Sequence, residues 1–124
     1  MGLFTGSCVA MATPFNKEGI NLEALGKTIV FQIEQGTDAL LVCGTTGEPA
    51  TMSREEKASV IRYTVEKTAK RVPILAGVGG NHTAEVVRAS MEAEKLGADA
   101  VLAVTPYYNK TNARGLIAHY REIN

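Results

Sequence analysis

The sequence predicts an α/β protein whose four strand–helix units form the first half of a (β/α)8 barrel. Four short segments are continuously apolar, as expected of strands buried on both faces. These segments span residues 7–12, 39–43, 73–78 and 100–104. They alternate with segments in which apolar residues recur every three or four positions, at residues 22–33, 61–69, 86–96 and 116–123. The predicted order is therefore β-α-β-α-β-α-β-α, in a single domain over residues 1–124.

Residues that favour helix starts stand where the helices are expected to begin. Asn21 can cap the first helix, and Ser53 with Glu56 forms the S-x-x-E capping box of the second. Thr83 and Thr111 stand where caps of the third and fourth helices are expected. These signals support the four-helix prediction.

Residues typical of helix ends and an internal repeat both support the predicted series of strand–helix units. Gly36 and Gly97 follow the first and third helices, where a left-handed residue is favoured, and Pro73 is expected to end the second. The segments GTDALLVCGTTG and GADAVLAVTPYY, which begin at these two glycines, share Gly-x-Asp-Ala before an apolar strand. Their offset of 61 residues equals two strand–helix units, since one unit takes about 30 residues.

The number of units favours a half-barrel. An eight-unit barrel usually needs about 250 residues, and this sequence has 124. The last helical pattern runs to Asn124 without a cap or a following strand, so we expect the chain to stop partway through the barrel. A four-stranded doubly wound sheet is the alternative that the pattern leaves open.

The composition excludes several classes of partner. Thirteen Lys and Arg residues balance thirteen Asp and Glu residues, which leaves no basic field for nucleic acid and no polybasic patch for a membrane. No apolar run approaches the roughly 18 residues of a membrane span. Cys8 and Cys43 lie in apolar segments without metal-ligand spacing, which predicts buried free thiols, no metal and a cytoplasmic location. A small ligand is the partner that this composition favours.

Three loops are expected at the carboxyl ends of the strands, where parallel α/β proteins bind ligands. They are residues 44–48, 77–81 and 105–109. In GTTGE, the hydroxyls of Thr45 and Thr46 either satisfy a strand-to-helix turn or, with backbone N–H groups, bind an anion such as a carboxylate. In TPYYN, the side chains of Tyr107 and Tyr108 should diverge. A phenol there could pack at an interface or relay a proton.

Together, VCGTTGE, PILAGVGGN with TAE one residue later, and VTPYYNK resemble the dihydrodipicolinate synthase family over the whole chain, from FTGSCVAMATPF onward. This family belongs to the N-acetylneuraminate lyase group of class I aldolases, which are (β/α)8 barrels. The resemblance implies an enzyme, a lyase that condenses pyruvate with aspartate semialdehyde in lysine and diaminopimelate biosynthesis, with pyruvate held as a Schiff base on a lysine. It implies no cofactor, and self-association into dimers and tetramers.

The resemblance also implies roles for the loop residues. Thr45 and Thr46 would hold the pyruvate carboxylate, and Thr45 would pass protons in a relay. Tyr108 would reach across a tight dimer interface into the neighbour's site and complete that relay.

A feedback site for lysine is implied beside the dimer cleft. Tyr107 would face that cleft, and Ala50, Asn81 and Glu85 match other positions of the effector site. Where lysine-inhibited members carry a histidine, this chain has Lys57, which could pair with Glu85 and occupy the place of the effector's ammonium group. We therefore expect lysine not to inhibit.

The family's Schiff-base lysine lies on the sixth strand, and a relay tyrosine and a substrate-binding arginine lie around the fifth. None of the seven lysines here lies in an apolar strand, where desolvation would favour imine formation, and only Lys110 is expected near the ligand face. The chain alone is therefore expected to be inactive, and to self-associate through open strand edges. Another pyruvate-dependent aldolase of the same group and a non-catalytic self-associating half-barrel are the alternatives.

Overall fold

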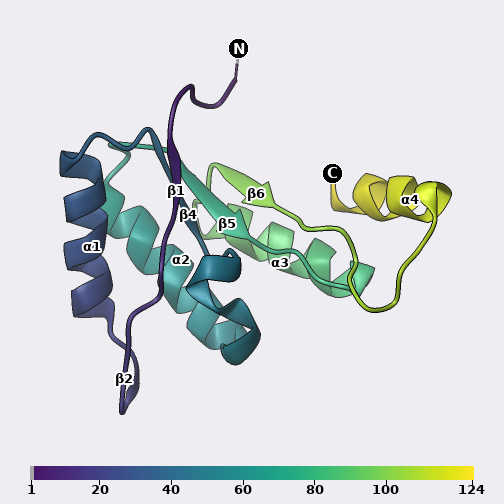
Figure 1. The fold of residues 1–124 in the computed structure, drawn as a ribbon, viewed down its shortest axis with the longest axis horizontal. Helices are drawn as coiled ribbons and strands as arrows, with labels where there is room; N and C mark the ends of the chain where they lie inside the picture. Colours follow the sequence, from purple (N-terminus) through teal and green to yellow (C-terminus); the bar gives the residue numbers. More distant parts are fainter. Residues whose placement is uncertain (1) are drawn as a thin grey trace.

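The computed structural model describes residues 2–124 and contains one four-stranded parallel sheet with four helices (Figure 1). The strands are β1 (Cys8–Ala10), β4 (Ala39–Val42), β5 (Ile74–Gly77) and β6 (Ala100–Leu102). The helices that alternate with them are α1 (Leu22–Glu34), α2 (Arg54–Thr68), α3 (Thr83–Lys95) and α4 (Ala113–Ile123). The spatial order of the strands, β1-β4-β5-β6, is also their order in the chain.

The strand order decides between the half-barrel and the doubly wound sheet. Because parallel crossovers are right-handed, strands that follow one another in chain order carry all their helices on one face. Figure 1 shows the helices succeeding one another in the same direction as the strands, and each helix packs on the next. A doubly wound sheet would reverse direction and carry helices on both faces. The prediction of four βα units of a half-barrel is confirmed.

The internal repeat has a structural reason in this sheet. Asp38 and Asp99 each stand just before a strand, and each carboxylate accepts a hydrogen bond from a backbone N–H at the start of the neighbouring strand. Asp38 accepts from Ser7 at 2.7 Å, and Asp99 accepts from Ile74 at 2.8 Å. The repeated aspartate therefore helps to set the register of β4 on β1 and of β6 on β5.

The predicted caps of α1 and α2 are present. Asn21 Oδ1 accepts a hydrogen bond from the backbone N–H three residues later at 3.0 Å, and Ser53 and Glu56 make both bonds of the capping box. Gly36 and Gly97 have φ angles of +88° and +95°, so they supply the left-handed residues predicted after α1 and α3.

The caps predicted for α3 and α4 are each wrong by one residue. His82 caps α3 through Nδ1, and Asn112 caps α4 through Oδ1, in place of Thr83 and Thr111. Asparagine is a better cap than threonine, which explains α4. At α3, Thr83 Oγ1 instead hydrogen-bonds to Nδ1 of His119 on α4 at 2.9 Å.

Two further local structures differ from the prediction. The α2 helix ends before Pro73, because Ala69 and Lys70 turn left-handed with φ angles of 50° and 60°. A small antiparallel hairpin, β2 (Phe15–Asn16) and β3 (Gly19–Ile20), follows β1 and was not predicted. Its two strands of two residues each are too short to show an alternating pattern.

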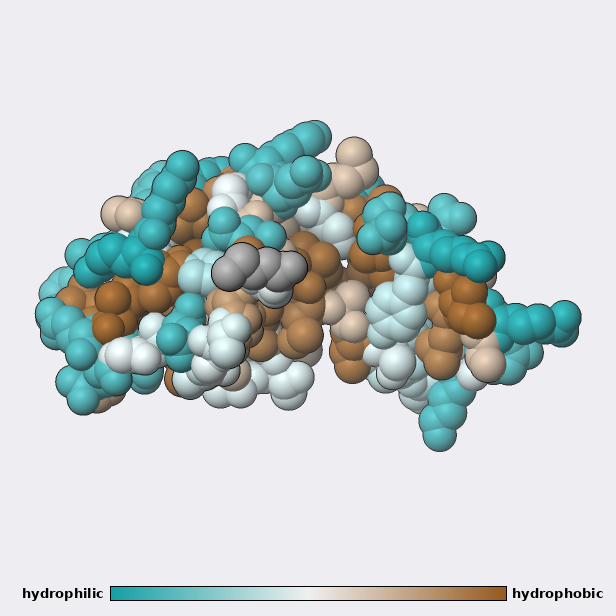
Figure 2. Space-filling view, turned by 90° about the horizontal axis from the view of Figure 1, so that it is seen from above, coloured by the Kyte–Doolittle hydropathy of each residue, from teal (hydrophilic) through white to brown (hydrophobic). Residues whose placement is uncertain are grey.

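The core fills the space between the sheet and its helices. Its fully buried apolar side chains include Leu25, Ile29, Leu40, Val42, Val60 and Val86. The edge strands are different, because Val101 and Leu102 are 37% and 48% exposed and Cys8 is exposed. The expectations that all strands are buried on both faces and that Cys8 is buried are therefore wrong. Figure 2 shows hydrophobic side chains at the surface between hydrophilic ones. Within residues 2–124, no helix is long and apolar enough to cross a membrane.

Candidate functional site

The chain leaves β4 through two consecutive single helical turns, η1 (Thr45–Gly47) and η2 (Pro49–Thr51). Cys43 before the first turn and Glu48 between the turns have φ angles of 56° and 55°. Left-handed backbone at non-glycine residues costs about 1–3 kcal/mol each and gathers at functional sites. Glu48 is held there because its carbonyl accepts hydrogen bonds from both the N–H and the hydroxyl of Thr51, at 3.0 and 2.9 Å.

The hydroxyls of Thr45 and Thr46 are not needed to close this turn. The backbone closes it, since Gly47 N–H donates to the Gly44 carbonyl at 2.8 Å and Glu48 N–H to the Thr45 carbonyl at 3.1 Å. Both threonines are exposed, and no hydrogen bond among residues 2–124 involves either hydroxyl. Both hydroxyls are therefore free to bind a ligand.

A cavity of about 270 Å³ opens beside Thr45, where the loops after β4, β5 and β6 meet. Its polar wall residues are Thr45, Glu48, Lys57 and Tyr107. Thr46, on the same turn, is not part of this wall. The three loops predicted to share the carboxyl face therefore come together around one cavity.

Two glycines allow the loops to approach so closely. A Cβ atom on Gly77 would lie 2.1 Å from the carbonyl oxygen of Cys43, and a Cβ atom on Gly79 would lie 2.5 Å from the backbone nitrogen of Val104. Both close approaches are to backbone atoms, which cannot rotate away. The cavity therefore depends on glycine at these two positions.

A second cavity, of about 310 Å³, lies next to the first and shares Lys57 and Tyr107 with it. Asn81 and Glu85 also line this second cavity. Four of the five residues assigned to a possible effector site are thus brought together, while the fifth, Ala50, lines the first cavity.

The predicted ion pair between Lys57 and Glu85 is wrong. Glu85 pairs instead with Arg88, and Arg54 pairs with Glu92 at 2.8 Å. Arg88 lies three residues from Glu85 on the same helix, where side chains are neighbours, whereas Lys57 lies on α2. Among residues 2–124, no carboxylate forms an ion pair with Lys57.

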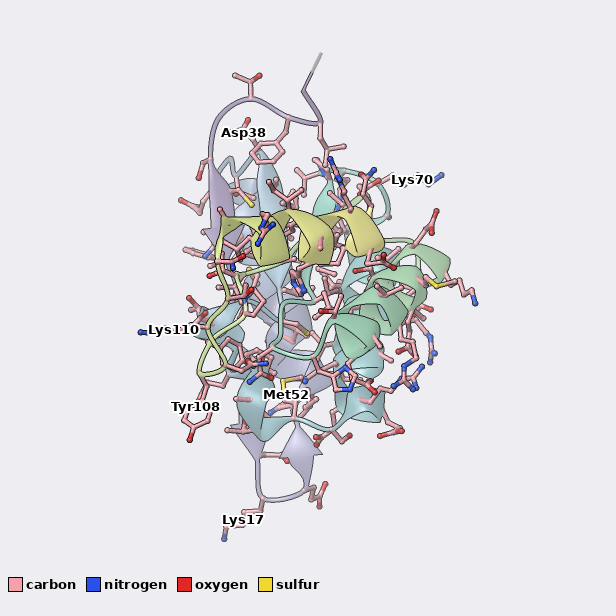
Figure 3. The ribbon with its side chains drawn as sticks, turned by 90° about the vertical axis from the view of Figure 1, so that its right-hand side faces the viewer. Lys17, Asp38, Met52, Lys70, Tyr108 and Lys110 are labelled. Atoms are coloured by element: carbon pink, nitrogen blue, oxygen red, sulfur yellow. The ribbon has the colours of Figure 1, made fainter. Side chains whose placement is uncertain are left out.

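Tyr107 and Tyr108 point in different directions. Tyr107 is 55% exposed and lines both cavities. Its carbonyl accepts a hydrogen bond from Asn81 Nδ2 at 3.2 Å, and Asn109 Nδ2 donates to the Asn81 carbonyl at 3.0 Å, so the loops after β5 and β6 are tied together. Tyr108 has a φ angle of 65°, is 96% exposed and points away from the sheet (Figure 3).

Lys110, expected near the ligand face, points outward (Figure 3) and lines neither cavity.

Lys57 and Cys43 border the first cavity, and the sequence analysis did not predict that either residue would lie there. Burial, partly offset by the charge of Lys57, raises the pKa of the Cys43 thiol to about 11, so it is protonated at neutral pH and a poor nucleophile. Lys57 directly follows Glu56 of the capping box, and nothing in that position indicates the first cavity. No group of three His, Cys, Asp or Glu side chains within residues 2–124 could hold a metal ion.

Comparison with known proteins identifies the family of this chain. Residues 3–124 match the model of the dihydrodipicolinate synthetase family. The chain belongs to this family. The 4-hydroxy-tetrahydrodipicolinate synthase of Thermoanaerobacter sp. (strain X514) is 54% identical over 123 residues, which are 99% of this chain. The synthase of the same name from Acetivibrio thermocellus is also 54% identical, over 121 residues and 98% of this chain.

Solved structures of the family share this fold. The dihydrodipicolinate synthase from Aquifex aeolicus is similar to 97% of this chain, with a TM-score of 0.94 and 48% identity. The one from Thermotoga maritima is similar to 98% of it, with a TM-score of 0.96 and 39% identity. The chain spans 41% of each of these two structures and 41% of the Thermoanaerobacter relative. Its four βα units thus correspond to about two fifths of the family's full length.

Proposed function

We propose that this chain supplies part of the active site of a 4-hydroxy-tetrahydrodipicolinate synthase, which condenses pyruvate with aspartate semialdehyde in lysine and diaminopimelate biosynthesis. The observation that carries the proposal is the pair of free hydroxyls on the turn after β4, at Thr45 and Thr46, of which Thr45 borders a cavity at the carboxyl ends of the strands. A cavity of about 270 Å³ suits a small oxo-acid. The relatives that match nearly the whole chain carry the name of this synthase.

In this proposal the two threonines bind the carboxylate of pyruvate. A hydroxyl that donates to a carboxylate makes a charge-assisted hydrogen bond, so this end of the substrate needs no cation. Thr45 borders the cavity and also passes a proton, while Thr46, the next residue of the same turn, contributes its free hydroxyl. The lysine that forms the Schiff base is proposed to lie outside residues 1–124, because no lysine of this chain lies in a strand.

A second subunit completes the proton relay in this proposal. Tyr108 is 96% exposed and borders neither cavity of its own chain. Its ring is therefore available to enter the corresponding cavity of a second copy, as a phenol that exchanges a proton with Thr45. Self-association of the synthase into at least a dimer follows from this role.

The test is a chimera in which residues 1–124 replace the matching segment of the Thermoanaerobacter synthase. We expect it to consume pyruvate and aspartate semialdehyde. Thr45→Val should lower kcat/KM by roughly 10²-fold or more, the usual contribution of a proton-transfer group, whereas Thr45→Ser, which keeps the hydroxyl, should retain most of the activity. Tyr108→Phe should lower kcat by a similar factor, and Tyr63→Phe, at a residue of α2 that lines neither cavity, should not.

Three results would contradict the proposal. A Thr45→Val chimera as active as the parent would show that the Thr45 hydroxyl does not bind the pyruvate carboxylate. Equal rates for Tyr108→Phe and Tyr63→Phe would show that Tyr108 does not relay a proton across subunits. A chimera that condenses pyruvate with a different aldehyde in preference to aspartate semialdehyde would support another aldolase of the same group.

We also propose that lysine does not inhibit this enzyme. Lys57 borders the second cavity and has no acidic partner among residues 2–124, so an incoming ammonium group would meet a like charge. Millimolar L-lysine should leave the rate of the chimera unchanged, and Lys57→His should make it more sensitive. Strong inhibition of the unmutated chimera by lysine would end this proposal.

A further inference from the structure

The direction of the Tyr108 ring is not set by contacts of the ring itself. The ring is 96% exposed, and no hydrogen bond among residues 2–124 involves its hydroxyl. The φ angle of Tyr108, 65°, lies in the left-handed region, which a tyrosine adopts only where the surrounding structure holds it there. The backbone on either side of Tyr108 therefore determines where its phenol points.

Two asparagine side chains hold the backbone on both sides of Tyr108. Before it, the Tyr107 carbonyl accepts a hydrogen bond from Asn81 Nδ2 at 3.2 Å. After it, Asn109 Nδ2 donates to the Asn81 carbonyl at 3.0 Å. The backbone closes the same bend, since the Asn109 N–H donates to the Tyr107 carbonyl at 2.8 Å. We call the two side-chain bonds between Asn81 and this bend the asparagine bridge.

The loop that carries Asn81 is itself fixed to β6. The Val78 N–H donates to the Leu102 carbonyl at 3.0 Å, where the loop leaves the sheet. One residue later, Gly79 approaches the next strand so closely that a Cβ atom would lie 2.5 Å from the backbone nitrogen of Val104. Asn81 is therefore a fixed point on which the asparagine bridge can act.

We propose that Asn109 is a positioning residue, whose side-chain N–H keeps Tyr108 left-handed and so aims the phenol at the site of a second subunit. This inference rests on the proton relay proposed above for Tyr108. Asn109 lines neither cavity, so it acts through Tyr108 and transfers no proton itself. An aspartate at this position would have the same shape but no N–H to donate to the Asn81 carbonyl.

The test uses the chimera and removes the N–H donor in two ways, by Asn109→Ala and by Asn109→Asp, which keeps the shape of the side chain. Each variant should lower kcat by about fivefold, the factor that one hydrogen bond contributes to an equilibrium. Each should leave KM for pyruvate unchanged, because the hydroxyls that bind the carboxylate lie on η1. Lys110→Ala is the matched control at the next residue, which is exposed and lines neither cavity, and it should retain the parent kcat.

A double-mutant cycle separates the positioning of Tyr108 from a general loosening of the loop. If Asn109 acts through the phenol, Asn109→Ala should lower kcat no further once Tyr108→Phe is in place. A further fivefold loss in the double variant would overturn the proposal. So would the full parent kcat in Asn109→Ala or in Asn109→Asp.

Crystal structures of the chimera give a measurement that does not depend on the relay. The parent and Lys110→Ala should keep residue 108 left-handed, whereas Asn109→Ala should let it become extended. An unchanged φ angle and ring position in Asn109→Ala would overturn the role of Asn109, whatever the kinetics of the other variants. Full activity of Tyr108→Phe, with the backbone of Asn109→Ala changed as expected, would instead contradict the proposed relay.

Discussion

Substitution of Gly77 by alanine tests how closely the loops must approach to form the first cavity. A methyl group at this position would lie 2.1 Å from the Cys43 carbonyl oxygen, 2.5 Å from the Cys43 carbonyl carbon and 2.7 Å from the Gly44 nitrogen. All three are backbone atoms of the turn that leads to Thr45. The turn must therefore move by about an ångström to restore ordinary contacts.

The expected cost of Gly77→Ala is about 2–3 kcal/mol, since overpacking that shifts backbone costs about 1–3 kcal/mol or more. For a chain of this length that lowers Tm by roughly 10 °C. Gly80→Ala is the matched control, because its methyl group would meet only Val86 Cγ2, at an ordinary 3.4 Å. Replacing an unstrained glycine by alanine stabilises by about 0.4–1 kcal/mol through the unfolded chain, so Gly80→Ala should be neutral or slightly stabilising.

The assay is urea unfolding followed by circular dichroism, with the free energy of unfolding taken from the midpoint and slope. A Gly77→Ala chain as stable as the parent would show that the backbone contact at Gly77 is not close enough to matter. An equal loss of stability in Gly80→Ala would also contradict the prediction, because the whole loop and not one backbone contact would then be sensitive.

Three further predictions concern stability and thiol reactivity. Ser53→Ala should cost about 1 kcal/mol in urea unfolding, the value of a helix cap, because it removes half of the α2 capping box; an unchanged midpoint would contradict this. A disulfide-exchange reagent at pH 8 should modify exposed Cys8 and spare buried Cys43, and mass mapping would show the opposite if the burial were wrong. The pKa of Cys43 is raised from 9.0 to about 11 in the folded state, so the folded state holds the proton more tightly and stability should fall as pH rises from 9 to 11. A Cys43→Ala variant should lose that part of the decline, and identical pH profiles for the two proteins would contradict the prediction.

The fold could be predicted because its signals are local and repeated. Apolar strands, helix periodicity and the Gly-x-Asp-Ala repeat all act within a few residues, and Asp38 and Asp99 make equivalent bonds in the sheet. The starts of the helices were harder to predict, because two neighbouring residues can each cap the same helix. Thr83 could have capped α3, but its hydroxyl bonds to His119 on α4, a partner 36 positions away that no local pattern indicates.

The sequence predicted which loops form the site, but not which charged side chains pair within it. The order of parallel strands brings the three loops together, which follows from topology alone. Whether Glu85 pairs with Lys57 or with Arg88 depends on the relative placement of α2 and α3, which the sequence pattern does not contain. The same limit explains why Lys57 was not expected to border the first cavity. The exposure of Cys8 on the edge strand β1 was not predicted, because an apolar strand has the same sequence pattern whether or not another element covers its outer face.

We propose that these 124 residues provide the carboxylate-binding part of a pyruvate site but not its nucleophile. The most direct test is intact mass after incubation with pyruvate and borohydride, which reduces a Schiff base to a permanent adduct. We expect no adduct on the 124-residue chain, and one adduct per subunit of the chimera, mapped to a lysine outside residues 1–124. An adduct on Lys57 or Lys110 of the isolated chain would contradict it.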